Sequence, residues 1–187
     1  CPMSDYGYPL DFRGVIQHEA GGHGFGKLGD EYIYHNAFIQ ACGCTCCPHA
    51  YELMSAQSKG WFQNLSLTGK MSDVPWRNFI FHEKYSGFVD IFEGGYMHSR
   101  GVFRSEQNSC MNNEIPYYST ISRYEIVKRI MEYAGEPFSF DKFVENDIVE
   151  VVAETAATKD GNTGMDSRSA SMNSHEPVFM GERKTLR

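Results

Sequence analysis

The sequence predicts one domain with an α+β fold, mainly helical and with short strands, and three observations predict it. The chain has 187 residues, which suits a single domain with a hydrophobic core. Hydrophobic residues make up 41% and aromatic residues 14% of the chain, enough apolar surface to offset the entropy of ordering most of it. Helical and strand-like patterns then occupy different stretches, as an α+β fold requires.

Three segments carry helix signals. Asp11 is a candidate N-cap for the first helix. Pro48 suits the first turn of a second helix, which we expect to run towards Trp61. The sequence SRYE from Ser122 is typical of a capping box that opens a third helix, and Gly135 supplies a stop signal.

The strand signals lie between the second and third helices. Residues 86–104 alternate short apolar runs with glycines, which predicts strands or extended loops over 88–92 and 101–103. After residue 154 the chain turns to small and polar residues with few large apolar ones. We therefore assign the domain to residues 1–154 and expect residues 155–187 to be a polar tail, a linker or the start of another module.

Charge and hydropathy limit the kinds of partner that we expect for this chain. The chain has 24 acidic residues against 17 Lys and Arg, and this net charge of -7 disfavours a nucleic-acid partner. No stretch approaches the roughly 18 consecutive apolar residues of a membrane-spanning helix, so we expect no membrane span.

The cysteines leave two alternatives open. Four of the 6 cysteines lie in the run CGCTCC from Cys42 to Cys47, and the others are Cys1 and Cys110. The even number suits disulfides, whereas the regular C-x-x-C pairs of zinc sites are missing. We expect disulfides or inert thiols and keep a metal cluster as the alternative.

The segment from His18 to Tyr32, HEAGGHGFGKLGDEY, carries the chemistry. It differs by one residue from the HExxH pattern, whose histidines lie about 40° apart around an α-helix and so face one Zn²⁺. Here the histidines are five residues apart, which in a regular helix separates them by about 140°. A one-residue π-bulge restores a common face, and Gly21 and Gly22 permit it because they lack Cβ atoms.

A catalytic zinc site also needs a third protein ligand and a position left for water or substrate. Asp30 and Glu31 follow His23 closely, and glycines between them allow the chain to turn back towards the metal. We predict His18, His23 and Asp30 as the ligands, because the shorter Asp side chain suits a tight return. Glu31 remains the alternative to Asp30.

Glu19 follows the first ligand directly, the position of a general base. Taken alone, a histidine belongs to the core or the surface and Glu19 is a solvated carboxylate. Packing does not explain the combination, because it favours Ala and Leu over the glycines of this segment. A purely structural zinc is disfavoured because such sites are usually thiolate-rich and closed. We assign surface or core roles to the remaining histidines, which are His35, His49, His82, His98 and His175.

The segment from His18 to Tyr32, with its Gly-Asp-Glu-Tyr ending, resembles the signature of the bacterial IgA-peptidase family of zinc metallopeptidases. The resemblance continues through FEGGY at 92–96, GVFR at 101–104 and NSCM at 108–111, and spans roughly residues 10–135. Most members of that family have a four-residue step between the histidines. A five-residue step is similar to that of the dipeptidyl peptidase III family.

The resemblance implies a zincin fold of the metzincin-like type, in which Met111 forms a Met-turn beneath the ligands. It implies a sheet before the active-site helix, so that the domain 1–154 lacks an upstream sheet. It also implies a bacterial protein that is secreted, periplasmic or on the cell surface. The implied substrate is a protein or peptide, with glycoproteins and immunoglobulins suggested by the resemblance alone.

These observations together predict a zinc-dependent endopeptidase in which Glu19 accepts a proton from a metal-activated water. Tyr96, Tyr117 and Tyr118 are considered for oxyanion stabilisation, and none is assigned that role. The alternative function is a non-catalytic surface binding or scaffold module with a degenerate zincin site, in which the extra residue has spoiled the ligand geometry.

Overall fold

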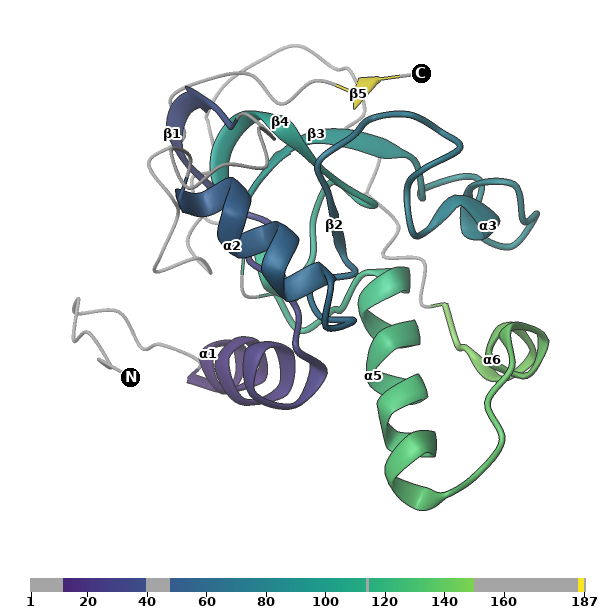
Figure 1. Ribbon diagram of the computed structural model, residues 1–187. Helices are drawn as coiled ribbons and strands as arrows, with labels where there is room; N and C mark the ends of the chain where they lie inside the picture. Colours follow the sequence, from purple (N-terminus) through teal and green to yellow (C-terminus); the bar gives the residue numbers. More distant parts are fainter. Residues whose placement is uncertain (1–11, 40–47, 114, 150–184, 187) are drawn as a thin grey trace, which may run out of the picture.

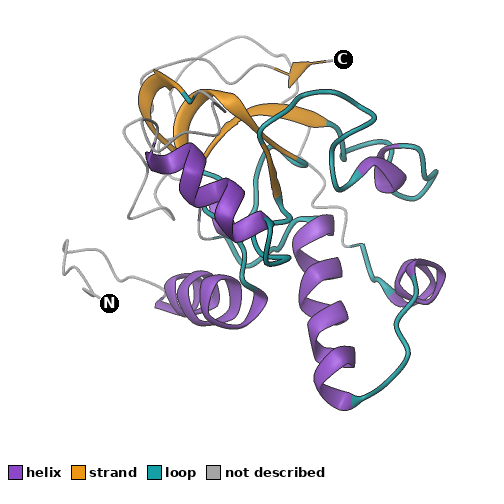
Figure 2. Ribbon diagram, in the orientation of Figure 1, coloured by secondary structure: helices purple, strands orange, loops and turns teal. Residues whose placement is uncertain are grey.

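The structure, a computed structural model, describes residues 12–39, 48–113, 115–149 and 185–186 (Figure 1). Asp11 and the cysteines of the run from Cys42 to Cys47 lie outside these ranges, as do Cys1, His175 and most of the segment 155–187. The described chain is a small sheet with several helices, which confirms the predicted α+β class (Figure 2). The elements in chain order are α1 (Phe12–Ile16), the π-helix η1 (Gln17–Gly26), β1 (Ile33–Phe38), α2 (Pro48–Gln57), β2 (Leu65–Ser66), α3 (Arg77–Ile80), β3 (Ile91–Gly95), β4 (Met97–Arg104), α4 (Cys110–Asn113), α5 (Thr120–Ala134), α6 (Phe140–Asn146) and β5 (Thr185–Leu186).

The sheet has the strand order β1-β4-β3-β5, and β2 also pairs with β4. β4 is parallel to β1 and antiparallel to β2 and β3. In Figure 1 the strands gather on one side of the molecule, and α1 and α5 lie on the other. Within the segment 155–187, the described residues Thr185 and Leu186 pair with β3 in this same sheet.

The hairpin of β3 and β4 corrects the predicted strands at 88–92 and 101–103. The first strand begins at Ile91, and the two glycines that follow belong to it. The turn consists of Tyr96 and Met97, whose φ angles are 45° and 68°. A two-residue hairpin turn with two positive φ angles matches the right-handed twist of the strands, although Asn and Gly usually occupy it. The turn was missed because neither residue is a turn former.

Two helix boundaries also differ from the prediction. α2 ends at Gln57 rather than near Trp61, because Gly60 adopts a φ of 75° and its N–H bonds to the Gln57 carbonyl at 2.9 Å. α5 begins one turn earlier than the predicted capping box, with Ser119 as its N-cap. Ser122 is buried inside the helix, with its hydroxyl 2.8 Å from that of Ser119. Gly135 ends α5 with a φ of 70°, as predicted.

The sequence analysis missed β1, β2, α3, α4 and α6. The helix α6 has a recognisable N-cap, because the Ser139 hydroxyl accepts a hydrogen bond from the Lys142 N–H at 3.2 Å. Burial and exposure do not alternate along β1: its first residue is buried and the next three are exposed. An edge strand of this kind carries no period-two signal for sequence analysis to detect.

Two hydrophobic clusters hold the fold together. In the first, Phe79 packs against Tyr124, Phe140 and Phe143, with ring centroids 5.0 to 5.9 Å apart, and so joins α3, α5 and α6. The second contains Leu53 of α2 and residues of β2 and β4, and it fixes α2 against the sheet. Edge-to-face and tilted ring pairs such as those of the first cluster stabilise the fold by more than the burial of their apolar area alone.

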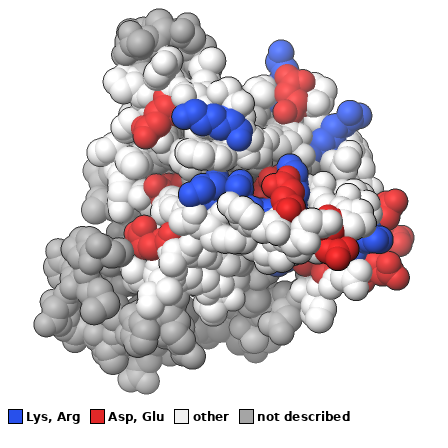
Figure 3. Space-filling view, turned by 60° about the horizontal axis from the view of Figure 1, so that its bottom comes forward, with Lys and Arg blue, Asp and Glu red and all other residues white. Residues whose placement is uncertain are grey.

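Two surface properties complete the description. None of the helices in the described ranges has the length and apolar character needed to cross a bilayer. On the face that Figure 3 draws, basic and acidic side chains of the described residues are interspersed, and no broad basic patch is seen there.

Candidate metal centre

Both histidines of the motif lie on η1, which continues directly from α1. We predicted one extra residue looped into an α-helix, and the structure instead forms a π-helix over Gln17–Gly26. In a π-helix the hydrogen bonds join residues five apart, so His18 and His23 lie on the same face one turn apart. The five-residue step therefore keeps the common face that a regular α-helix would lose.

Gly21 and Gly22 serve this helix by leaving space. Neither has a positive φ, so left-handed backbone is not their role. A Cβ on Gly21 would collide with the Tyr118 hydroxyl, which donates to the Gln17 carbonyl. A Cβ on Gly22 would collide with the sulfur of Met111. The glycines therefore let a tyrosine and a methionine reach the backbone of the π-helix.

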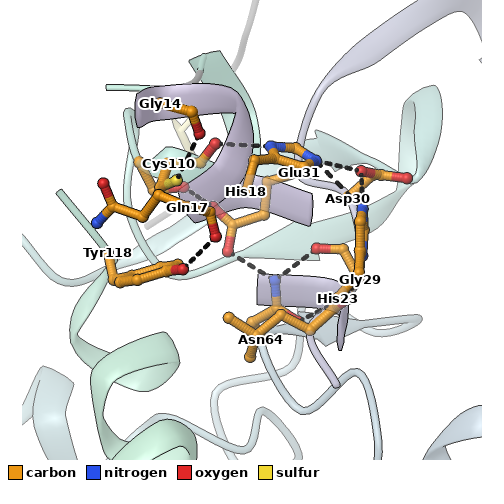
Figure 4. Close-up of polar contacts among 12 residues, drawn as sticks. Gly14, Gln17, His18, His23, Gly29, Asp30, Glu31, Asn64, Cys110 and Tyr118 are labelled. Carbon is orange, nitrogen blue, oxygen red and sulfur yellow. Dashed lines mark hydrogen bonds and ion pairs between the residues drawn. The ribbon is translucent and has the colours of Figure 1, made fainter. Parts of the chain in front are cut away.

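The structure brings together three of the predicted site residues, His18, His23 and Asp30 (Figure 4). The Nε2 atoms of the two histidines are 3.1 Å apart. Asp30 Oδ1 lies 3.1 Å from His18 Nε2 and 2.9 Å from His23 Nε2. Within the described ranges, this is the one group of His, Cys, Asp or Glu in which three or more ligand atoms converge in this way.

The other ring nitrogens fix the tautomers. His18 Nδ1 lies 2.9 Å from the Cys110 carbonyl oxygen, and His23 Nδ1 lies 2.8 Å from that of Leu28. A carbonyl only accepts, so each Nδ1 carries a proton. When a ring is neutral, the lone pair of its Nε2 therefore points at the other ring and at Asp30. Metal-binding histidines almost always donate their second N–H to such a carbonyl or to a carboxylate.

The group fits a divalent cation. With metal-to-ligand distances of about 2.0 to 2.2 Å, the ligand atoms of a tetrahedral site lie about 3.3 to 3.6 Å apart, slightly wider than the spacing observed here. Without a cation, three lone pairs at this spacing repel each other unless protons lie between them. His18, His23 and Asp30 are therefore the residues that could hold a metal ion.

Asp30 favours protonation of both imidazoles. Burial lowers the pKa of His18 and of His23, but the hydrogen bonds and charge of Asp30 outweigh it, and both pKa values lie above 6.5. Burial likewise raises the pKa of Asp30, but the bonds to both histidines outweigh it and lower the value to about 2. The carboxylate therefore stays ionised and attracts cations, whether protons or a metal ion.

Of the two candidates for the third ligand, the structure brings Asp30 and not Glu31 to the imidazoles. Glu31 is fully buried and points into the protein, where Oε1 accepts from Asn64 at 2.9 Å and Oε2 accepts from the Ser109 hydroxyl. Burial raises the pKa of Glu31 to about 7, although these hydrogen bonds lower it. Of the two carboxylates, Asp30 is the one that could act as the third ligand.

Glu19 lies on η1 beside His18, and its side chain is exposed. Its negative charge reaches the site, because it adds to the rise that Asp30 produces in the pKa of His23. The cluster itself is partly open, with 29% of the His23 side chain and 13% of the Asp30 side chain exposed. An exposed carboxylate thus lies beside an accessible group of ligand atoms.

Met111 is fully buried against η1 at Gly22. Its carbonyl accepts from the Glu31 N–H at 2.7 Å, so the same short segment contacts both the π-helix and the chain that carries Asp30. The neighbouring Cys110 supplies the carbonyl that fixes His18. Residues 110–111 therefore form a buried support beneath the candidate ligands.

Sequence reasoning missed Tyr32 and Asn64. The Tyr32 ring stacks on His18 with centroids 6.2 Å apart, and burial together with the nearby Asp30 raises the pKa of its hydroxyl. Tyr32 could have been found, because it closes the quoted motif. Asn64 bonds to Gly29 and Glu31 from a segment more than thirty residues away, and no local signal marks it.

Several other tyrosines and histidines considered in the sequence analysis have hydrogen-bond partners away from the three candidate ligands. Tyr117 donates to Glu106 at 2.7 Å, and Tyr118 bonds to the Gln17 carbonyl. His49 Nδ1 and His98 Nε2 are 2.9 Å apart, but the buried Nδ1 of His98 has no hydrogen-bond partner among the described residues. This pair therefore lacks the carbonyl that orients a metal-binding histidine.

Comparison with known proteins adds no assignment. No family model matches this chain, and no curated protein matches it in sequence. The resemblance to the IgA-peptidase family therefore rests on the motif residues alone and stays a prediction.

Proposed function

We propose that this chain is the catalytic domain of a zinc-dependent endopeptidase, with His18, His23 and Asp30 as ligands and Glu19 as general base. The observation that carries the proposal is the convergence of three lone-pair atoms within 3.1 Å while both Nδ1 atoms are held by carbonyls. Such an arrangement orients two imidazoles for a metal before the metal arrives.

The donor set favours zinc in a catalytic role. Imidazole suits zinc and other transition metals, whereas calcium and magnesium prefer oxygen ligands alone. Two histidines and one carboxylate are a common set in catalytic zinc sites and leave one position for water or substrate. The partial exposure of His23 and Asp30 supports access to that position.

Glu19 supplies the proton chemistry of the proposal. When bound, zinc polarises the scissile carbonyl and lowers the pKa of a water molecule towards about 7. Glu19 removes a proton from the attacking water as its oxygen bonds to the carbonyl carbon. Glu19 then gives this proton to the amide nitrogen as the C–N bond breaks. General acid-base catalysis of this kind typically contributes about 10²- to 10⁴-fold.

The finer parts of the proposal come from the resemblance. The buried Met111 beneath Gly22 supports a metzincin-like arrangement, in which a methionine lies under the ligands. The proposed substrates are proteins or peptides, and the proposed location is extracellular, periplasmic or at a bacterial cell surface.

The experiment measures zinc and proteolysis together. Protein purified without added metal is analysed for zinc content, and casein cleavage is assayed with and without a chelator. We expect one zinc per chain, cleavage that the chelator abolishes, and a Glu19→Ala variant that keeps zinc but loses turnover. Glu145→Ala, which removes an exposed carboxylate on the distant helix α6, is the matched control and keeps both. Zinc without cleavage, also in a longer chain that includes the upstream sheet implied by the resemblance, would favour the non-catalytic scaffold. No zinc in wild type would contradict the site itself.

A further inference from the structure

Asn64 is a fully buried polar residue that contacts both neighbours of Asp30 (Figure 4). Its Oδ1 accepts from the Gly29 N–H at 2.8 Å, and its Nδ2 donates to the Gly29 carbonyl at 2.8 Å. The same Nδ2 donates to Glu31 Oε1 at 2.9 Å. The Asn64 amide therefore both accepts from and donates to the backbone of Gly29, the residue before Asp30, and donates to the side chain of Glu31, the residue after it.

The chain around Asp30 has no regular secondary structure to hold it. η1 ends at Gly26, the left-handed Lys27 turns the chain with a φ of 54°, and β1 begins only at Ile33. The backbone groups of residues 27–32 therefore need partners from elsewhere in the fold. The segment 62–65 supplies several, because the Phe62 N–H also bonds to the Lys27 carbonyl at 2.8 Å.

Gly29 is shaped for this contact. A Cβ there would lie 2.7 Å from Leu65 Cδ1 and 3.2 Å from the Phe62 ring, closer than side chains normally approach. A larger residue would require the side chains of Leu65 and Phe62 to shift, so glycine lets the segment 62–65 come near enough for the Asn64 amide to pair with the backbone. The sequence around the third candidate ligand therefore matches the position of Asn64.

Asn64 also decides which carboxylate is available. Together with the Ser109 hydroxyl it occupies both oxygens of Glu31 and holds this side chain in the interior. The adjacent Asp30 side chain then points to the other side, towards the two Nε2 atoms. The buried Asn64 amide thus holds the backbone beside Asp30, the candidate ligand, and keeps Glu31, the alternative ligand, in the interior.

We propose that Asn64 is a positioning residue that places the Asp30 carboxylate in the metal site and keeps Glu31 out of it. The inference rests on the proposed metal-binding function. Replacing residues that orient metal ligands typically lowers metal affinity about 10- to 100-fold, and we expect a loss in this range when Asn64 is replaced.

The test uses the full chain with cobalt as a visible substitute for zinc. Zinc affinity is measured by competition with a chromogenic chelator, and the cobalt absorption spectrum reports the ligand geometry at saturating metal. Asn64→Ala removes every contact, and Asn64→Asp keeps the shape and one acceptor but no donor. Both variants should bind zinc more weakly, and their cobalt spectra at saturating metal should differ from that of the wild type. A purely structural role for Asn64 would leave the spectrum unchanged.

Asn112→Ala is the matched control, because Asn112 is also buried and donates to the Gln107 carbonyl instead of to residues 27–31. It should keep the wild-type cobalt spectrum. Wild-type affinity and spectrum in both Asn64 variants would overturn the inference, as would failure of both variants to fold, which would show that Asn64 holds the whole fold and not the ligand. A wild-type protein that binds no metal would instead contradict the proposed function.

Discussion

Replacing Gly22 with alanine tests whether the π-helix depends on the space that this glycine leaves. The new methyl group would overlap the sulfur of Met111, and the Met111 methyl carbon would lie 2.9 Å away. Met111 is fully buried, so it cannot move aside freely. Overpacking of this kind costs about 1 to 3 kcal/mol, and the gain from replacing a helical glycine offsets about 0.5 to 1 kcal/mol. Because two atoms of this buried side chain lie within 3 Å of the new Cβ, the cost falls in the upper half of its range, and we expect Gly22→Ala to lower the free energy of unfolding by about 1 to 2 kcal/mol.

Urea unfolding of the metal-free protein measures this change. With a slope of about 2 kcal/mol per molar, the midpoint should fall by roughly 0.5 to 1 M. Gly24→Ala is the control in the same helix, because Gly24 is exposed and its Cβ would meet only the Glu19 carbonyl oxygen at 3.3 Å. Its stability should stay the same or rise slightly. An unchanged midpoint for Gly22→Ala, or an equal fall in both variants, would refute the argument.

Four further predictions concern pH, the third ligand and the distant end of the fold. The folded pKa values of His18 and His23 lie above 6.5, so zinc must displace protons from these imidazoles when the pH is below their pKa values. Zinc affinity should therefore fall as the pH falls through these pKa values. A calorimetric titration of zinc binding that shows no pH dependence would contradict this. The free energy of unfolding of the metal-free protein should change with pH in the opposite direction. The interactions that raise these two pKa values stabilise the folded protein fully below pH 6.5, and this contribution disappears as the pH rises through the two folded pKa values. Asp30→Ala should lose stoichiometric zinc while Glu31→Gln keeps it, and elemental analysis showing the reverse would make Glu31 the ligand. Asp147→Ala leaves the partly exposed Arg123 without its two 2.8 Å hydrogen bonds to Asp147 and should cost about 1.5 to 3 kcal/mol in chemical unfolding without changing zinc content.

The candidate ligands could be predicted because they are local. His18, His23 and Asp30 lie within thirteen residues, and helix periodicity with an acidic pair indicates how they can converge. The irregular helix was also foreseeable, because a five-residue step between histidines requires it. Its extension to a π-helix over Gln17–Gly26 was not, because it depends on Tyr118 and Met111 packing against glycines from distant parts of the chain.

The support of the site could not be predicted, because it consists of contacts between distant segments. Asn64 reaches Gly29 across 35 residues, and the Cys110 carbonyl reaches His18 across 92. A single sequence contains no signal for such pairings. The helix that opens at Ser119 shows a different limit, because Ser119 and Ser122 are both capable N-caps, both are fully buried, and the sequence pattern alone does not decide between them.

The most direct test of the central claim is an anomalous difference map recorded at the zinc edge from crystals of the protein grown with zinc. The account predicts one peak bonded to the Nε2 atoms of His18 and His23 and to a carboxylate oxygen of Asp30, with Glu31 still bonded to Asn64. A map with no peak there, or with the two imidazoles turned away from each other, would contradict it.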